Sequence, residues 1–363
     1  MAYTINHYEI AKVKPGMVLG KPVLNRYGRI LLAEGIELNQ TLINRMLEQY
    51  ITMVAIREEL FYQNDRILLE DPGVFNYLGA VAEVRNLIKV IRHVKKIPVK
   101  QFKQVVETRI LPIVESCAAI NYLNIDRPRE EYIFHHCVNV ALLSGVIGKW
   151  LGCGKSEIAN LTLAGLLHDI GKTQVPDEIL NKAGKLTERE MQMMQLHSAH
   201  SYKLLSQTEN LPFDVMIGVL QHHERLDGSG YPGHFQQSKI HLHARIIAVA
   251  DVYDAITADR SYSNKATPFV AAEVLANNMF SKLDAAICTT FLEQFECFML
   301  GNLVELTTGQ SGEIIHLGNF LNLSPIIRCN NGELIKLCNI NQISNVRAFI
   351  IPDHKASRDG SGG

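Results

Sequence analysis

The chain has 363 residues, which is enough for two or three domains and a large apolar core. Hydrophobic residues make up 47% and charged residues 20%, and the net charge of -1 excludes the strongly basic field of many nucleic-acid-binding proteins. The seven cysteines include no CxxC pair, which predicts reduced thiols. We see no apolar run of membrane length and no secretory leader. We therefore expect a cytoplasmic protein without a DNA, RNA or membrane partner.

Residues 1–60 predict a small α+β module. Strands are expected at 17–24, 29–33 and 51–56, and Asn39 can cap a helix that runs to about Gln49. No residues here have catalytic spacing. We interpret the segment as a packing module, with a regulatory or dimerising role, and hence a homodimer, as the alternative.

The remaining chain is predicted to be mainly helical, with a β appendage. In a helical connector at 61–120, residues 81–91 and 102–120 carry apolar side chains at helical spacing. The basic residues of this connector, Lys89, Arg92, Lys95 and Lys96, are most simply a solvated helix face. Residues 121–300 are helical throughout. Short strands follow at 303–306, 313–317, 326–329 and 335–337 within 301–352, and the tail at 353–363 is expected to be disordered.

The helix expected at 132–150 holds the first candidate for chemistry. His136 lies on its apolar stripe and should face the core, whereas His135 shares a different face with Asn139. We therefore choose His136 as the buried ligand. A single core histidine is more often hydrogen-bonded than metal-bound.

The next candidate pair ends an apolar helical run. Ser156 is expected to cap this helix, His168 falls on its inward face, and Asp169 follows, before Gly171 and Lys172. An unpaired buried carboxylate at this position would cost on the order of 3 kcal/mol or more, so Asp169 requires a cation.

Four further histidines follow. Thr187 and Glu190 form a capping box that should start the helix carrying His197, and we interpret His200 as a surface or supporting residue. Next, His222 and His223 precede a glycine-rich loop at 227–232. Adjacent helical side chains point about 100° apart, so both reach one site only near a helix end or across two metals.

The last candidates lie on the helix expected at 244–258. Asp251 and Asp254 share an otherwise apolar face and call for cations, which Lys172 or Arg260 could provide for Asp254. Imidazole and carboxylate, without cysteine, are ligands of divalent metals, and the set suffices for two ions.

These motifs resemble the HD-GYP phosphodiesterases, a branch of the HD hydrolase superfamily, over roughly residues 125–300. The matching runs are HDIGK at 168–172, HHER at 222–225, DGSGYP at 227–232 and DVYDA at 251–255. The resemblance implies an all-helical HD-type domain that hydrolyses cyclic di-GMP to linear pGpG and on to GMP. It also implies two divalent metals, iron or else manganese. The implied ligands are His136, His168, Asp169, His197, His222, His223 and Asp251.

By the resemblance, Asp169 would bridge the metals. The chemistry of two metals then predicts that activated hydroxide attacks phosphorus, and Lys172, just past the ligand pair, is placed to neutralise the phosphate. The expected substrate contacts are Lys172, Tyr231, Asp254 and Arg260.

Two departures from the family pattern matter. Tyr132 replaces the glutamate of trinuclear members, which predicts a binuclear site, and Ser263 replaces a basic residue near the substrate. The alternatives are an HD hydrolase of another nucleotide, which the intact GYP loop disfavours, and a catalytically silent cyclic-dinucleotide sensor, which the complete ligand set disfavours.

Overall fold

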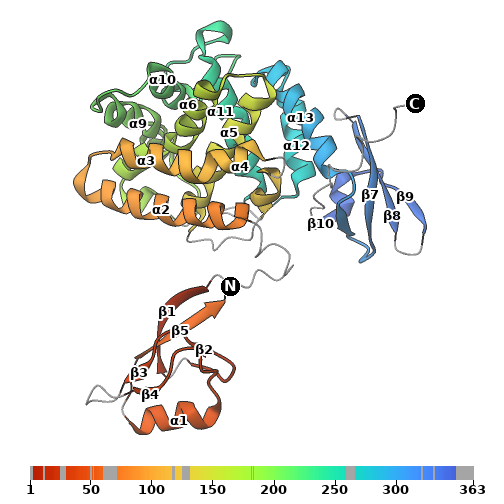
Figure 1. Cartoon of the computed structure of the whole chain (residues 1–363). Helices are drawn as coiled ribbons and strands as arrows, with labels where there is room; N and C mark the ends of the chain where they lie inside the picture. The colour runs from red at the N-terminus through yellow and green to blue at the C-terminus, as the bar shows by residue number, and fades with distance from the viewer. Residues whose placement is uncertain are drawn as a thin grey trace, which may run out of the picture. The chain divides into compact units, whose positions relative to one another are not determined.

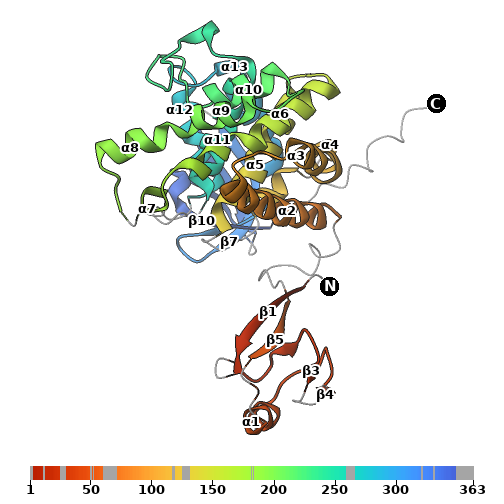
Figure 2. The same cartoon turned by 90° about the vertical axis from the view of Figure 1, so that its left-hand side faces the viewer.

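The computed structural model describes residues 3–10, 13–24, 30–49, 51, 53–59, 72–116, 119–124, 131–180, 182, 184–258, 266–319, 322–329 and 332–348. The chain divides into two compact units, Met1–Asp71 and Pro72–Gly363. The second unit is mostly helical with a small sheet near its end, which confirms the mainly α fold class (Figures 1 and 2). Among the described helices, none has the length and apolar character that a bilayer crossing requires.

The first unit is a small α+β structure. Its elements are β1 (Tyr3–Glu9), β2 (Val18–Leu19), β3 (Val23–Leu24), β4 (Ile30–Leu32), α1 (Gln40–Glu48) and β5 (Met53–Glu59). One antiparallel sheet has the order β1-β5-β2, and β3 pairs with β4. The Asn39 side chain accepts a hydrogen bond from the backbone of Leu42, which confirms the predicted cap.

Two strand predictions for this unit need correction. The single strand expected at 17–24 is split into β2 and β3, because Pro22 lies between them and has no N–H to donate to a ladder. The sequence analysis also missed β1, which pairs along its whole length with β5.

The helices of the second unit are α2 (Pro72–Val94), α3 (Val99–Val105), α4 (Leu111–Glu115), α5 (Tyr132–Trp150), α6 (Lys155–Leu167), α7 (Asp177–Leu180), α8 (Glu188–Gln195), α9 (His197–Ser206), α10 (Phe213–Gln221), α11 (Leu242–Thr257), α12 (Pro268–Asn278) and α13 (Ala285–Met299). A π-helical turn, η3 (Val106–Ile110), joins α3 to α4, and a 3-10 helix, η6 (Ile170–Gln174), follows α6.

Helix α5 is the centre of the helical unit. It packs against α2, α4, α6, α11 and α13 (Figure 1). Because these helices surround it, every residue from 135 to 148 is buried. His135 and His136 are each only 2% exposed. The apolar-stripe argument that set His135 aside was therefore wrong about burial, because a helix enclosed on all sides has no solvent face to contrast with its core face.

Two helix starts differ from prediction. Gly154, not Ser156, is the N-cap of α6: its backbone is extended, and the Ile158 N–H donates to its carbonyl at 2.9 Å. The capping box at Thr187 is present, but the helix that it starts ends at Gln195. His197 begins a separate helix, α9, after a break at Leu196.

A small antiparallel sheet ends the described chain beside α12 and α13 (Figure 1). Its strands are β6 (Leu303–Leu306), β7 (Ser311–Asn319), β8 (Asn322–Cys329), β9 (Leu334–Lys336) and β10 (Ile343–Ala348). The order is β10-β6-β7-β8-β9. The first four strands confirm the prediction, whereas β10 was missed; the tail at 353–363 lies outside the described residues.

Candidate metal centre

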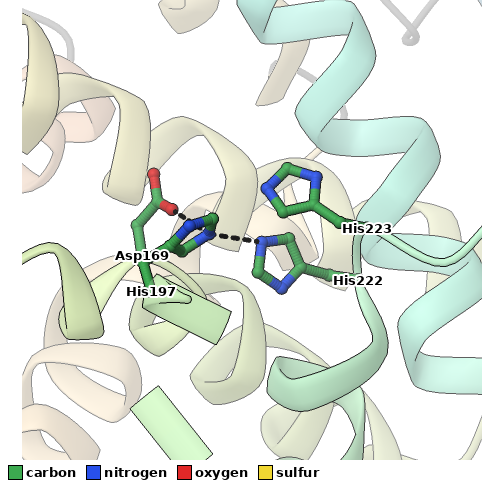
Figure 3. A group of neighbouring side chains, drawn as sticks. All are labelled: Asp169, His197, His222 and His223. Carbon is green, nitrogen blue, oxygen red and sulfur yellow. Dashed lines mark hydrogen bonds and ion pairs between the residues drawn. The ribbon is translucent and has the colours of Figure 1, made fainter. Parts of the chain in front are cut away.

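Seven imidazole and carboxylate side chains from five segments converge inside the helical unit. They form two groups within which the candidate ligand atoms all lie within 4.8 Å of one another. The first group contains Asp169, His197, His222 and His223, and the second contains His136, His168 and Asp251. Figure 3 shows the four side chains of the first group directed toward one another. Every residue that we predicted as a metal ligand lies in one of the two groups.

Asp169 connects the two groups. Its Oδ1 lies 3.3 Å from Nε2 of His197, in the first group. Its Oδ2 lies 3.4 Å from Nε2 of His136 and 3.2 Å from Nε2 of His168, in the second. Oδ1 is buried, and within the described chain no hydrogen bond reaches it. A buried carboxylate oxygen without a hydrogen bond is costly unless a cation satisfies it.

Three of the histidines are oriented by backbone carbonyl groups just before them in the chain. The Nδ1 atoms of His168, His197 and His222 lie 2.7, 2.7 and 2.6 Å from the carbonyl oxygen three residues earlier in the chain. A carbonyl only accepts, so Nδ1 carries the proton and donates. Each Nε2 then presents its lone pair to the centre, as a metal ligand requires.

His136 is oriented differently, by a carboxylate. Its Nδ1 donates to Oδ2 of Asp254 at 2.7 Å, and Oδ1 of Asp254 accepts from the Asn139 amide at 2.5 Å. We expected Lys172 or Arg260 to serve Asp254. Lys172 instead contacts Oδ2 of Asp169 at 2.6 Å, and Arg260 lies outside the described residues, as does Ser263. Asp254 is fully buried behind His136, where one of its oxygens fixes the orientation of the His136 ring.

The charges of the centre suit metal binding. Burial raises the pKa of the Asp169 carboxyl, but His168 and Lys172 outweigh it and hold the pKa well below its usual value. Burial likewise opposes ionisation of Asp251, whose pKa the contacts with His136 and His223 keep well below normal. Both carboxylates therefore stay negative.

The histidines of the first group are neutral near pH 7. Burial lowers the pKa of His197 to about 4, and it also lowers the pKa values of His222 and His223 well below their usual range. His136 differs from these three. Burial alone would lower its pKa, but Tyr132 and the carboxylates of Asp169, Asp251 and Asp254 outweigh burial and raise the pKa of His136 well above normal.

The spacing of the donors fits divalent ions. Nε2 of His136 lies 3.3 Å from Nε2 of His168, and Nε2 of His197 lies 3.4 Å from Nε2 of His222. Two nitrogen donors, each about 2.1 Å from one ion, are separated by about 3.0–3.4 Å for right-angle to tetrahedral arrangements. The set contains nitrogen and oxygen donors only, which suits iron, manganese or zinc.

The glycine-rich loop closes over one side of the centre. The Tyr231 ring lies against the His223 ring, with 4.6 Å between ring centroids. The backbone N–H of Tyr231 donates to the His223 carbonyl. Burial raises the pKa of Tyr231, so its hydroxyl keeps its proton. Gly230 is required here, because a Cβ would lie 2.4 Å from the His223 carbonyl oxygen.

Sequence reasoning missed four supporting residues. Tyr77 and Asn139 hydrogen-bond to each other behind His136. Ser201 accepts from the Gly171 N–H, and the Glu224 carboxylate accepts the backbone N–H groups of Gly233 and Phe235, just after the glycine-rich loop. Asn139, a polar residue within an apolar helical run, and Glu224, within the HHER run at 222–225, left signals in the sequence. His200 is partly buried on α9 and belongs to neither ligand group.

Comparison with known proteins identifies the fold and its relatives. Residues 109–287 match the family model described as HD domain. A Pseudomonas aeruginosa protein named cyclic di-GMP phosphodiesterase is 36% identical over 201 residues, which cover 55% of this chain and 48% of the relative. A Vibrio cholerae protein named 3'3'-cGAMP-specific phosphodiesterase 1 is 42% identical over 139 residues, which cover 38% of this chain and 32% of the relative.

One solved structure has a similar fold. It is described as Bd1817, an HDGYP protein from Bdellovibrio bacteriovorus, and it aligns with a TM-score of 0.53 at 14% identity. The alignment covers 80% of this chain and 99% of that chain. The chain spans about half or less of the length of the two curated relatives above.

Proposed function

We propose that the chain, whose residues 109–287 match the HD domain model, is a phosphodiesterase that hydrolyses cyclic di-GMP with two divalent cations. The observation that carries this proposal is the position of Asp169, whose two oxygens face separate groups of donors. When bound, divalent cations supply a nucleophile from water near neutral pH and stabilise negative charge on phosphate oxygens. Iron is the expected metal and manganese the alternative.

The count of two is supported by what surrounds His136. Tyr132 stacks on the His136 ring, with 5.3 Å between ring centroids, and brings no carboxylate there. Glu131 precedes Tyr132 in the sequence, and its carboxylate pairs with Arg85 at 2.5 Å. The donors described at the centre therefore divide into two groups that share the Asp169 carboxylate, and neither group includes a described glutamate.

Two residues beside the ligands are proposed to act on the substrate. The Lys172 ammonium remains charged, because Asp169 outweighs the effect of burial and raises the pKa of the lysine. It would neutralise the phosphate and orient it for attack. The protonated Tyr231 hydroxyl would donate a hydrogen bond to the dinucleotide. Linear pGpG, and GMP after a second cleavage, are the proposed products.

The substrate assignment has one specific competitor. A relative specific for 3'3'-cGAMP is 42% identical over its matched region, so this dinucleotide is the second candidate. The two substrates share the phosphodiester chemistry and differ in one base, so the metal chemistry alone does not distinguish them. A cytoplasmic location, a homodimer and the lack of a nucleic-acid polymer partner remain predictions.

The test combines metal analysis with product analysis. Anaerobically purified protein should contain two iron or manganese ions per chain and linearise cyclic di-GMP, with 3'3'-cGAMP assayed in parallel. Asp169→Asn should lose both metal and turnover. The matched control is Asp177→Asn, which changes a mostly exposed carboxylate that pairs with Arg92 and should keep both. Parent-like turnover in Asp169→Asn would show that the site assignment is wrong.

A further inference from the structure

A continuous chain of hydrogen bonds runs from α2 to the candidate ligand His136. The Tyr77 hydroxyl donates to Oδ1 of Asn139 at 2.8 Å, and Nδ2 of Asn139 donates to Oδ1 of Asp254 at 2.5 Å. His136 donates through Nδ1 to the other oxygen of Asp254 at 2.7 Å. Tyr77, Asn139 and Asp254 are fully buried, so water does not compete for these bonds.

The donor and acceptor types permit one consistent arrangement of this chain. As a carboxylate, Asp254 only accepts, so Asn139 must turn its Nδ2 toward Asp254 and its Oδ1 away from it. Oδ1 then requires a donor, and the Tyr77 hydroxyl provides it. The same hydroxyl oxygen lies 3.0 Å from Nδ1 of His135, which can donate to it. Tyr77 thus holds the Asn139 amide in the orientation that fixes Asp254.

We propose that Tyr77 is a positioning residue for His136, acting through Asn139 and Asp254. The proposal rests on the metal site proposed above. Tyr77 belongs to α2, at residues 72–94, whereas the HD domain match begins at residue 109. The orientation and basicity of this ligand therefore depend on a helix outside the matched domain. A hydrogen-bonded partner on the far nitrogen of a ligating histidine tunes metal affinity, and its own supports share in that effect.

The test measures metal binding directly, apart from turnover. Metal-free full-length protein is titrated with Mn²⁺ by calorimetry, and its thermal unfolding without metal is recorded separately. Tyr77→Phe removes only the hydroxyl, and we expect Mn²⁺ to bind roughly threefold to tenfold more weakly. The matched control is Tyr122→Phe, which removes a different buried hydroxyl and should leave the dissociation constant unchanged.

A double-mutant cycle separates positioning from packing. In an Asp254→Ala background the route from Tyr77 to His136 is interrupted, so Tyr77→Phe should cause no further loss of Mn²⁺ affinity. A general packing defect would weaken binding in both backgrounds by the same factor, and that result would overturn the proposal.

Other outcomes separate the two proposals. If the parent protein shows no saturable Mn²⁺ binding, the proposed metal site itself fails. If the parent binds Mn²⁺ and Tyr77→Phe binds it within twofold of the parent, only the role of Tyr77 fails. Should Tyr77→Phe not fold, Asn139→Ser breaks the same chain of hydrogen bonds at its next member. Parent-like Mn²⁺ affinity in that variant refutes the inference equally.

Discussion

Replacing Gly171 with alanine should disable the candidate metal centre without removing any of its ligands. Gly171 lies in the turn after Asp169, where it packs against the start of α9. A Cβ at this position would lie 2.0 Å from the His197 carbonyl oxygen, 2.5 Å from the Ser201 nitrogen and 2.7 Å from the Ser201 hydroxyl. Two of these three atoms belong to the backbone and cannot rotate away.

The size of the disturbance follows from these distances. Ordinary van der Waals contact with a Cβ begins near 3.4 Å, so the turn and α9 must separate by about 1.4 Å. Asp169 moves with the turn and His197 with α9. Metal–ligand distances tolerate only about 0.2 Å, so both residues cannot hold one ion after such a shift. We expect Mn²⁺ affinity to fall by roughly 10- to 100-fold and unfolding free energy by about 1–3 kcal/mol.

Calorimetric titration with Mn²⁺ and thermal unfolding provide the assay. The matched control is Gly154→Ala, at the N-cap of α6, where a new Cβ meets nothing within 4 Å and the backbone is extended. It should leave Mn²⁺ affinity unchanged and lower the unfolding free energy by no more than about 1 kcal/mol. Parent-like affinity and stability in Gly171→Ala would refute the close-approach argument.

Two further predictions concern the loop and an exposed helix start. Glu224→Gln should speed hydrogen exchange at the Gly233 and Phe235 amides, because each donates to one carboxylate oxygen, at 2.6 and 3.0 Å, and the amide can accept only one of them. The second prediction concerns Glu190. Hydrogen bonds, of which the one from Lys182 has the largest effect, lower the pKa of the Glu190 carboxyl to about 2. The ionised carboxylate therefore contributes fully to the stability of α8 above about pH 4.5. That contribution should decline as the pH falls toward 2, measured as exchange of α8 amides.

Each of these two predictions has its own control. Glu273→Gln changes an exposed glutamate on α12 and should leave exchange in the loop unaltered. For the helix start, Glu190→Gln removes the titrating group, so the exchange rates of α8 should become flatter between pH 4.5 and 2 after correction for intrinsic exchange. Unchanged pH dependence in Glu190→Gln would show that another group is responsible.

The sequence could predict the types of the candidate ligands and the helices that carry them. The bounds of α5 agree with the helix expected at 132–150, because its apolar content and length leave no other regular structure. The capping box at Thr187 was also recognisable, since its two hydrogen bonds depend on residues three apart. These features are local, and local spacing is what a sequence displays.

Contacts between distant segments were decided only by the tertiary structure. His136 and Asp254 are 118 residues apart, and Tyr77 and Asn139 are 62 apart, so no periodicity joins them. The burial of His135 likewise depended on how many helices surround α5. The sequence by itself determined which side chains could bind a cation. Packing determined which oxygen of Asp169 faces which histidines, because periodicity reports the face of a helix but not its neighbour.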